Sequence, residues 1–241
     1  MRVFLAGASG VIGRRLLPLL LGAGHQVTGT TRSQERAAQL RSAGVRPAVL
    51  DVFDAMAVRQ AVLAAAPDVV IHQLTDLPDV LEPPAMPAAL ARNARVRLEG
   101  TRNLMMAVRA AGVRRVIAQS IAWAYAEGTP PYRESDPLDN AAQGDRRVTV
   151  DGVIALEALV SGAPEVKSLV LRYGRLYGPN TWSADKSAPP ALHVDAAAHA
   201  AFVAISRGEP GIYNIAEEDG FVTSGKAREQ LGFDHAFRLP L

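Results

Sequence analysis

Three glycines near the start of the chain constrain its fold more than any other feature. An apolar run that begins at Val3 leads into Gly7-Ala-Ser-Gly-Val-Ile-Gly13, where glycine recurs at every third position. Glycine permits a sharp turn, lets a ligand approach the backbone, and allows a helix to pack closely on the preceding strand. Free N–H groups at the start of such a helix favour a pyrophosphate. The pattern therefore predicts a strand, a turn and a helix that bind a dinucleotide.

Length and composition set the scale of the fold and exclude some chemistry. The 241 residues, 49% of them hydrophobic, suit one large α/β domain with its own core. Cysteine is absent, which excludes disulfides, thiolate metal ligands and a cysteine nucleophile. The five histidines lack the spacing of metal ligands, so we expect no metal site.

Charge and hydropathy indicate the kind of partner. Lysine and arginine total 26 against 24 acidic residues, and the basic residues do not cluster beside aromatic ones. This argues against nucleic acid as a partner. No apolar run reaches the roughly 18 residues of a membrane span, and Met1 leads directly into the first predicted strand without a leader-like segment. We therefore expect a cytoplasmic protein that acts on a small molecule, without a membrane partner.

Predicted strands and helices alternate along the whole chain. After a helix at 11–23, strands are predicted at 26–31, 46–50, 68–72, 114–119, 168–172 and 211–215. Further helices are predicted at 34–42, 54–65, 88–111, 147–160 and 195–207. Alternation of this kind favours a parallel sheet with helices on both faces and right-handed connections. We predict an α/β fold with a doubly wound parallel sheet of the Rossmann type.

A long loop follows one of the central strands. Segment 120–144 is proline-bearing and irregular, and it begins where the predicted strand 114–119 ends. Open α/β sheets bind ligands at the carboxyl ends of their strands, and long loops in compact domains are commonly functional. We expect this loop to belong to a ligand site.

Several short motifs follow one another along nearly the whole chain. They are Gly7-Ala-Ser-Gly-Val-Ile-Gly13, Leu50-Asp51-Val52, Val70-Ile-His-Gln-Leu74, Gly100-Thr-Arg-Asn-Leu104, Gln119-Ser120 with Tyr125, Glu134-Ser-Asp-Pro-Leu138, Leu171-Arg-Tyr-Gly-Arg-Leu-Tyr-Gly-Pro179, His193-Val-Asp195 and Tyr213-Asn-Ile215. In their order and spacing the chain resembles the extended and atypical branch of the short-chain dehydrogenase/reductase superfamily, the NAD(P)-dependent epimerase/dehydratase group. The resemblance implies fold and cofactor more than it implies a substrate.

The resemblance implies a nicotinamide dinucleotide and the residues that hold it. The pyrophosphate contacts are Gly7, Ser9, Gly10, Val11, Ile12 and Gly13. Asp51 and Val52 contact the adenine, although Asp51 could instead be a turn residue that caps the helix starting near residue 54. Gln73 and Leu74 lie on the nicotinamide side, or else only end a strand, and Tyr173 is a further candidate for contact there.

The end of the second predicted strand indicates which dinucleotide is bound. Thr30-Thr31-Arg32-Ser33 lacks the acidic residue that would bind a ribose 2′-hydroxyl. Arg32 and Ser33 instead offer a guanidinium and a hydroxyl suited to a 2′-phosphate. We predict NADP, with NAD as the alternative cofactor; the alternative for Arg32 is a solvated loop residue.

One motif of the family is missing. Its Tyr-x-x-x-Lys pair falls on Thr149 and Val153, and no lysine of the chain stands four residues after a tyrosine. In the family the tyrosine phenol shuttles the proton that accompanies hydride transfer, and the lysine lowers the pKa of that phenol. The chain is also short between Pro179 and His193, so 179–193 and 216–241 are expected to form a reduced substrate-side subdomain of the single domain 1–241.

The missing pair leaves two interpretations of function open. In the first, the chain is an NADP-dependent oxidoreductase or epimerase-like enzyme for a small carbonyl or hydroxyl substrate. Ser120 and Tyr125 are then its catalytic residues, with the phenol titrating near its reference pKa of about 10. Ser120 and Tyr125 could equally be structural. In the second interpretation the chain is a dinucleotide-binding sensor or scaffold without catalysis.

The resemblance also implies an assembly. Relatives form dimers through two helices in each subunit, which correspond here to 88–111 and 147–160. The alternative is a monomer in which both helices face solvent, and the arginines of 88–111 are compatible with that. We predict a homodimer.

Overall fold

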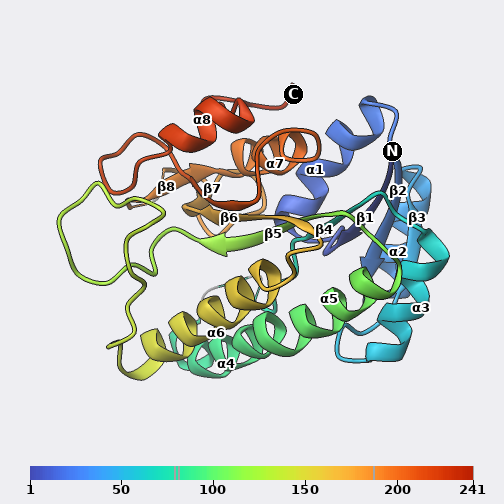
Figure 1. Ribbon diagram of the computed structural model, residues 1–241, viewed down its shortest axis with the longest axis horizontal. Coiled ribbons are helices and arrows are strands. Elements are labelled where there is room, and N and C mark those ends of the chain that lie inside the picture. The colour runs from blue at the N-terminus through green and yellow to red at the C-terminus, as the bar shows by residue number, and fades with distance from the viewer. Residues whose placement is uncertain (79, 81, 187, 241) are drawn as a thin grey trace.

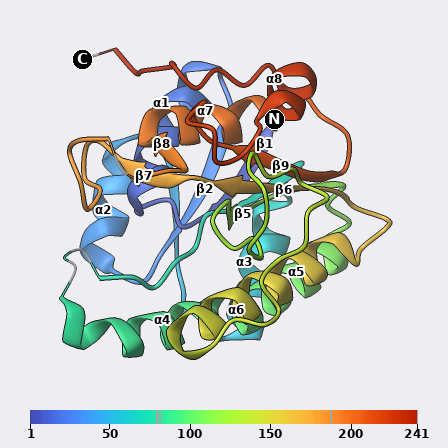
Figure 2. The ribbon, with the colours of Figure 1, turned by 90° about the vertical axis from the view of Figure 1, so that its left-hand side faces the viewer.

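The computed structural model describes residues 1–78, 80, 82–186 and 188–240. Its centre is a seven-stranded sheet in which all neighbouring strands are parallel, in the order β3-β2-β1-β4-β5-β6-β9 (Figures 1 and 2). The strands are β1 (Arg2–Ala6), β2 (Gln26–Thr31), β3 (Arg46–Val49), β4 (Val69–His72), β5 (Arg115–Ile121), β6 (Lys167–Tyr173) and β9 (Gly211–Ile215). The strand order reverses between β1 and β4, where open sheets form their ligand crevice. The predicted doubly wound Rossmann-type sheet is confirmed.

Helices cover both faces of the sheet. Figure 1 shows α1, α7 and α8 on one side of it and α4, α5 and α6 on the other. Side chains of a strand alternate between the two faces, so Leu5 packs in the first core and Phe4 in the second. The first face carries α1 (Val11–Gly22), α2 (Gln34–Ser42), α7 (Val194–Val203) and α8 (Gly225–Leu231), and the second carries α3 (Ala55–Ala65), α5 (Thr101–Ala110) and α6 (Gly144–Ser161), with α4 (Met86–Arg95) against α6.

The helix predicted at 88–111 is not regular throughout. A short 3₁₀ turn, η1 (Pro83–Ala85), precedes α4, and a π-helical segment, η2 (Val96–Gly100), separates α4 from α5. Gly100 ends this segment against Val52, and a Cβ there would lie 3.1 Å from a methyl group of Val52. The prediction of one regular helix was therefore wrong at η2. Segments of this type are frequent at functional sites.

The two helical stretches predicted to form a dimer lie side by side, because α4 and α6 pack on each other. A Cβ at Gly152 of α6 would lie 3.1 Å from the Cα of Ala94, so the absence of a side chain allows this close packing. Leu98, Met106 and Val148 on these helices are exposed. Exposed apolar side chains are what an interface between helices requires. The homodimer stays a prediction.

The last third of the chain adds short elements that the sequence did not predict. Strand β7 (Arg175–Tyr177) pairs in parallel with β8 (Ala191–His193) in a separate two-stranded sheet, and α8 follows later. Elements of three to seven residues are too short to show a period in the sequence. The subdomain of 179–193 and 216–241 stays a prediction. Within the described ranges, no helix has the length and apolar character needed to cross a membrane.

A buried ion pair connects α6 to the sheet. The carboxylate of Glu157 accepts hydrogen bonds from Nε and Nη2 of Arg172 on β6, at 2.9 and 2.7 Å. It also accepts one from the hydroxyl of Ser120 on β5, at 2.7 Å. All three side chains are buried. A charge in this position is stable only while its partner stays beside it.

We expect Glu157→Gln to lower the free energy of unfolding by about 3–5 kcal/mol, because it leaves the buried guanidinium of Arg172 without its countercharge. Urea unfolding measures this loss. Glu165→Gln is the matched control, since Glu165 pairs with Arg109 at 2.8 Å at the surface. That change should cost less than about 1 kcal/mol. Equal losses in the two variants would contradict the role assigned to the buried pair.

Candidate functional site

A cleft of about 310 Å³ lies at the carboxyl ends of the first strands. Its wall is formed by the end of β2 and the start of α2, by the segments that follow β1, β3 and β4, and by the start of η2. The lining residues are Gly7, Ser9, Gly10, Thr30, Thr31, Arg32, Ser33, Arg36, Leu50, Asp51, Val52, Phe53, Gln73, Leu74, Thr75, Asp76 and Val96. The structure thus brings together most residues that the resemblance implied for the cofactor. Val11, Ile12, Gly13 and Tyr173 are not part of this lining.

The glycine turn has the shape of a cradle that side chains would fill. Gly7 has a φ of +90°, and a Cβ there would lie 2.6 Å from the carbonyl oxygen of Gln73. A Cβ at Gly13 would lie 2.3 Å from the oxygen of Gly7. Helix α1 begins at Val11 after Gly10, whose carbonyl accepts the N–H of Arg14. The N–H groups of Val11, Ile12 and Gly13 therefore have no partner in the helix. A pyrophosphate fits this backbone.

One end of the cleft combines positive charge with hydroxyl groups. Arg32 follows β2, its side chain is 65% exposed, and its guanidinium is 3.4 Å from a carboxylate oxygen of Asp76. Ser33 caps α2, because its hydroxyl accepts the N–H of Arg36. An exposed ion pair of this geometry contributes little to stability. Its guanidinium is therefore available to a ligand anion.

Asp51 belongs to a turn beside the cleft. Its carboxylate accepts the N–H of Phe53 at 3.0 Å. The helix cap is a different residue, Asp54, which accepts the N–H groups of Met56 and Ala57 at 3.0 Å. Asp51 is therefore a turn residue that does not cap α3, and its contact with adenine stays a prediction.

The other end of the cleft holds an amide without a full set of partners. Nε2 of Gln73 donates to the hydroxyl of Tyr173 at 3.1 Å, and both side chains are buried. The oxygen of the same amide has no hydrogen-bond partner among the described residues. Whichever way the amide is turned, one of its two polar atoms remains unpaired. A buried amide atom of this kind fits the polar groups of a nicotinamide nucleotide.

His72 fixes the backbone beside this amide, and sequence reasoning missed it. Nδ1 accepts the N–H of Leu74 at 3.3 Å, so Nε2 carries the proton toward Thr101 Oγ1 at 2.9 Å. Burial lowers the pKa of His72 to about 4, and the positive charge of Arg97 acts in the same direction. The ring is therefore neutral at pH 7. Only its place at the end of a strand distinguished it in the sequence.

Arg97 is the second residue that sequence reasoning missed. It lies on η2, is buried, and donates from Nη1 to the carbonyl of Thr149 at 3.3 Å. Burial lowers the pKa of Arg97 to about 10, opposed by the charge of Glu157. Thr149 and Val153, which stand where the family has tyrosine and lysine, are both buried on α6. A positive charge from another helix thus lies beside the position of the missing pair.

Ser120 and Tyr125 lie in one buried network. The Ser120 hydroxyl donates to Glu157, while the phenol of Tyr125 donates to Asn214 Oδ1 at 2.6 Å and accepts from Arg172 Nη1 at 2.9 Å. Burial raises the pKa of Tyr125, opposed by the charge and hydrogen bond of Arg172. The expectation that this phenol titrates near 10 was wrong, because the side chain is desolvated. Its catalytic role stays a prediction.

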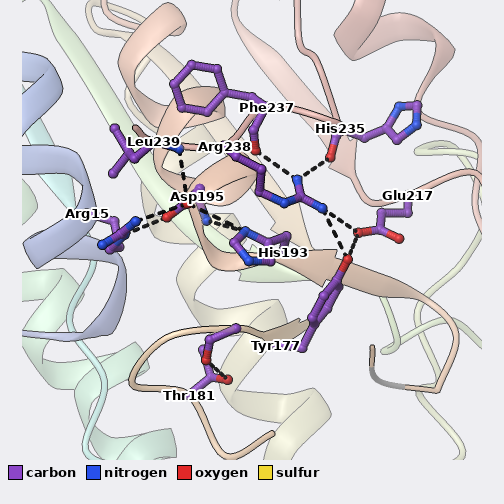
Figure 3. Close-up of polar contacts among 11 residues, drawn as sticks. Arg15, Tyr177, Thr181, His193, Asp195, Glu217, His235, Phe237, Arg238 and Leu239 are labelled. Carbon is purple, nitrogen blue, oxygen red and sulfur yellow. Dashed lines mark hydrogen bonds and ion pairs between the residues drawn. The ribbon is translucent and has the colours of Figure 1, made fainter. Parts of the chain in front are cut away.

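A second polar cluster ties the last described residues to the small sheet (Figure 3). The Tyr177 hydroxyl donates to Glu217 at 2.5 Å and accepts from Arg238 at 3.3 Å. Burial and the Glu217 carboxylate raise the pKa of Tyr177 to about 12. Beside them, Asp195 accepts from Arg15, through Nε at 2.5 Å and Nη2 at 3.0 Å. Arg238 thus holds the segment after α8 against β7, and the N–H of Leu239, which Asp195 accepts at 3.1 Å, holds it against α7.

We expect the stability that depends on His72 to fall as the pH is lowered. Its pKa in the folded protein, about 4, is below the ordinary 6.5, so the unfolded chain binds the proton first. The contribution is complete above pH 6.5 and is lost as the pH falls toward 4. The difference in unfolding free energy between wild type and His72→Asn should shrink by about 2–3 kcal/mol between about pH 7.5 and about pH 4.5. Urea unfolding over this range measures it, and a constant difference would contradict the neutral buried ring.

Comparison with known proteins agrees with this architecture. A model of the NAD dependent epimerase/dehydratase family matches residues 3–191. A 3-diazoavenalumate denitrifying reductase from a Streptomyces species is 40% identical over 240 residues, covering 91% of this chain and 77% of that protein. A 4-hydroxy-2-methyl-3-oxo-4-farnesyl-3,4-dihydroquinoline-1-oxide ketoreductase from Stigmatella aurantiaca is 30% identical over 143 residues, covering 57% of this chain and 39% of that protein.

Solved structures of similar fold include UDP-glucose 4-epimerases. The UDP-glucose 4-epimerase of Thermotoga maritima superposes with a TM-score of 0.78 at 16% identity, covering 99% of this chain and 94% of that one. The UDP-glucose 4-epimerase of Thermus thermophilus, in complex with NAD, gives 0.72 at 21% identity, covering 97% and 84%. Identities this low establish the fold alone. The family match and the 40% identical relative go further: the chain belongs to the NAD-dependent epimerase/dehydratase family.

Proposed function

We propose that the chain is an NADPH-dependent reductase of a small electrophilic substrate. One observation carries the proposal: the cleft joins a glycine cradle for a pyrophosphate to the buried, incompletely paired amide of Gln73. A catalytic use of such a cleft is supported by the 40% identical relative, whose name is that of a reductase. When bound, a reduced nicotinamide dinucleotide supplies the hydride.

The residues of this chain bind and orient in that reaction. Backbone N–H groups at the start of α1 hold the pyrophosphate, and Arg32 with Ser33 holds a 2′-phosphate. The Gln73 amide, fixed by Tyr173, contacts the nicotinamide half. His72 accepts the N–H of Leu74 and so fixes the backbone that follows Gln73. Arg97 supplies positive charge where the family has lysine.

Proton delivery distinguishes this chain from its relatives. The hydroxyls of Ser120 and Tyr125 already serve buried acceptors, so we propose that they position the loop after β5. The proton that a carbonyl substrate requires then comes from water or from the substrate itself. The alternative is that Ser120 and Tyr125 deliver the proton themselves, and the variant Tyr125→Phe distinguishes this from the positioning role.

An aromatic diazo compound is a second candidate substrate class. The Streptomyces relative is named a 3-diazoavenalumate denitrifying reductase, so its name refers to a diazo compound. In the net reaction hydride forms a new C–H bond, while the C–N bond breaks and its electron pair leaves with N₂. The dinucleotide is oxidised and the diazo carbon is reduced, and no proton is needed on oxygen. A site without a tyrosine–lysine pair suits this chemistry.

Turnover with a substrate panel tests the proposal. NADPH oxidation is followed with aldehydes, ketones, nucleotide sugars and an aryl diazonium salt, and N₂ release is measured for the last. Oxidation that depends on the protein and on one compound supports a reductase. Tight NADPH binding without turnover across the panel would instead favour the sensor or scaffold.

We expect Arg32→Ala to lower the affinity for NADPH on the order of 10- to 100-fold and to leave NADH binding unchanged, since one charge-assisted contact is lost. Fluorescence titration with both cofactors measures this. Arg41→Ala removes an exposed arginine from the far end of α2 and serves as the control. Equal affinity of wild type for both cofactors, or no loss in Arg32→Ala, would refute the preference for NADP.

We expect Tyr125→Phe to keep turnover within a few-fold, whereas loss of a general acid costs about 10²–10⁴-fold. Unfolding should become easier by about 1–3 kcal/mol, because Asn214 and Arg172 lose a buried partner. Tyr132→Phe is the control, since the Tyr132 ring stacks on Tyr125 with centroids 5.2 Å apart and its hydroxyl bonds to the backbone of Gly128, not to Asn214 or Arg172. A hundred-fold loss of turnover with unchanged cofactor binding would identify Tyr125 as the proton donor.

A further inference from the structure

Two side chains meet just beyond the carboxyl edge of the sheet. Ile121 of β5 and Tyr173 of β6 are register partners, and the N–H of Ala122 still bonds to the carbonyl of Tyr173 at 2.8 Å. Trp123 and Arg175 each follow their strand by two residues. The guanidinium carbon of Arg175 lies 4.8 Å from the centroid of the Trp123 ring. The pair is therefore placed next to Tyr173, whose hydroxyl binds the Gln73 amide.

The guanidinium of Arg175 has no countercharge within the described part of the chain. None of the ion pairs found there includes it, and none of the side-chain hydrogen bonds starts from its nitrogens. Arg172 nearby is held by Glu157 at 2.7 Å. Arg175 by contrast is fixed only by stacking, which leaves its row of N–H donors free.

The surroundings increase the positive charge at this point. Arg146 of α6 reaches under the same loop and donates to the carbonyls of Trp123 and Tyr125, at 3.3 and 2.9 Å. The ion pair of Arg146 with Asp139, at 2.6 Å, uses Nε. Burial lowers the pKa of Arg175, and the charge of Arg146 lowers it further. Among the described residues, Asp139 offsets the charge of Arg146, but no carboxylate is paired with Arg175.

We propose that Arg175, stacked on Trp123, binds the carboxylate of a small organic acid that is the substrate. This rests on the proposed reductase function and adds the substrate class. A planar guanidinium forks two hydrogen bonds to a carboxylate, and a stacked one loses little freedom on doing so. The aromatic ring beside it offers a surface for an unsaturated or aromatic body. Arg146 acts as a positioning residue, because it holds the Trp123 backbone.

Binding of an acid and its neutral amide tests the proposal. The probes are cinnamate and cinnamamide, added to protein loaded with NADP⁺. The chain has two tryptophans, so the change Trp182→Phe leaves Trp123 as the sole fluorescent indole and reports binding at this position. Arg175→Gln, Arg175→Lys and Arg59→Gln are compared in that background. Arg59 is an exposed residue of α3 and loses the same charge.

Cinnamate should bind wild type on the order of 10- to 100-fold more tightly than cinnamamide. Arg175→Gln should abolish that preference and leave cinnamamide binding unchanged. Arg175→Lys should keep part of it, and Arg59→Gln all of it. Equal affinities in wild type, a preference that survives Arg175→Gln, or no saturable signal from cinnamate would overturn the proposal.

Measurements of cofactor use keep this inference separate from the proposed function. NADPH binding and NADPH oxidation are recorded for the same variants. A wild type that reduces a panel compound but shows no preference for the acid would refute only the carboxylate site. A preference for the acid without any NADPH oxidation would refute the reductase and leave the anion site in place.

Discussion

The buried pair of Glu157 and Arg172 is the interaction on which the ligand side of the molecule depends. It joins α6 to β6, and through the Ser120 hydroxyl it reaches β5 as well. The third nitrogen of the same guanidinium, Nη1, donates to the phenol of Tyr125, which lies in the irregular segment between β5 and α6. Strand ends, helix and loop are thus organised around one ion pair. The hydroxyls of Ser120 and Tyr125, which the sequence alone presents as free, are engaged because they hydrogen-bond to Glu157 and Arg172 of this buried pair.

The cleft at the glycine turn depends instead on residues that lack a side chain. Gly7 and Gly13 have no room for a Cβ, so backbone alone faces the place of the pyrophosphate. Side chains become informative only at the two ends, with exposed Arg32 at one and buried Gln73 at the other. In the proposed function, backbone shape would hold the centre of the dinucleotide, and the side chains of Arg32 and Gln73 would contact its two ends. The lining of this cleft includes neither Thr149 nor Val153, which stand at the positions of the tyrosine–lysine pair.

Local signals predicted most of the fold. Apolar runs and helical periodicity located the strands of the main sheet, and glycine spacing located the turn, because each depends on neighbours in sequence. Contacts across the chain could not be predicted. Gln73 meets Tyr173 after 100 residues, and Tyr125 meets Asn214 after 89. These partners decide whether a hydroxyl is free, so the sequence could nominate Ser120 and Tyr125 without revealing that both are engaged. The same reason hid His72 and Arg97.

The contact between Arg15 and Asp195 joins residues 180 positions apart. The same carboxylate accepts the N–H of Leu239, so one side chain on α7 holds both an early helix and the end of the described chain. During synthesis α1 leaves the ribosome long before its partner exists. The face of α1 that packs on α7 stays exposed to water until α7 has been synthesised. Contacts between residues so far apart in sequence slow folding, because the chain loses loop-closure entropy before the contacts stabilise it. The nascent protein is therefore expected to complete the packing of α1 against α7 late in its folding.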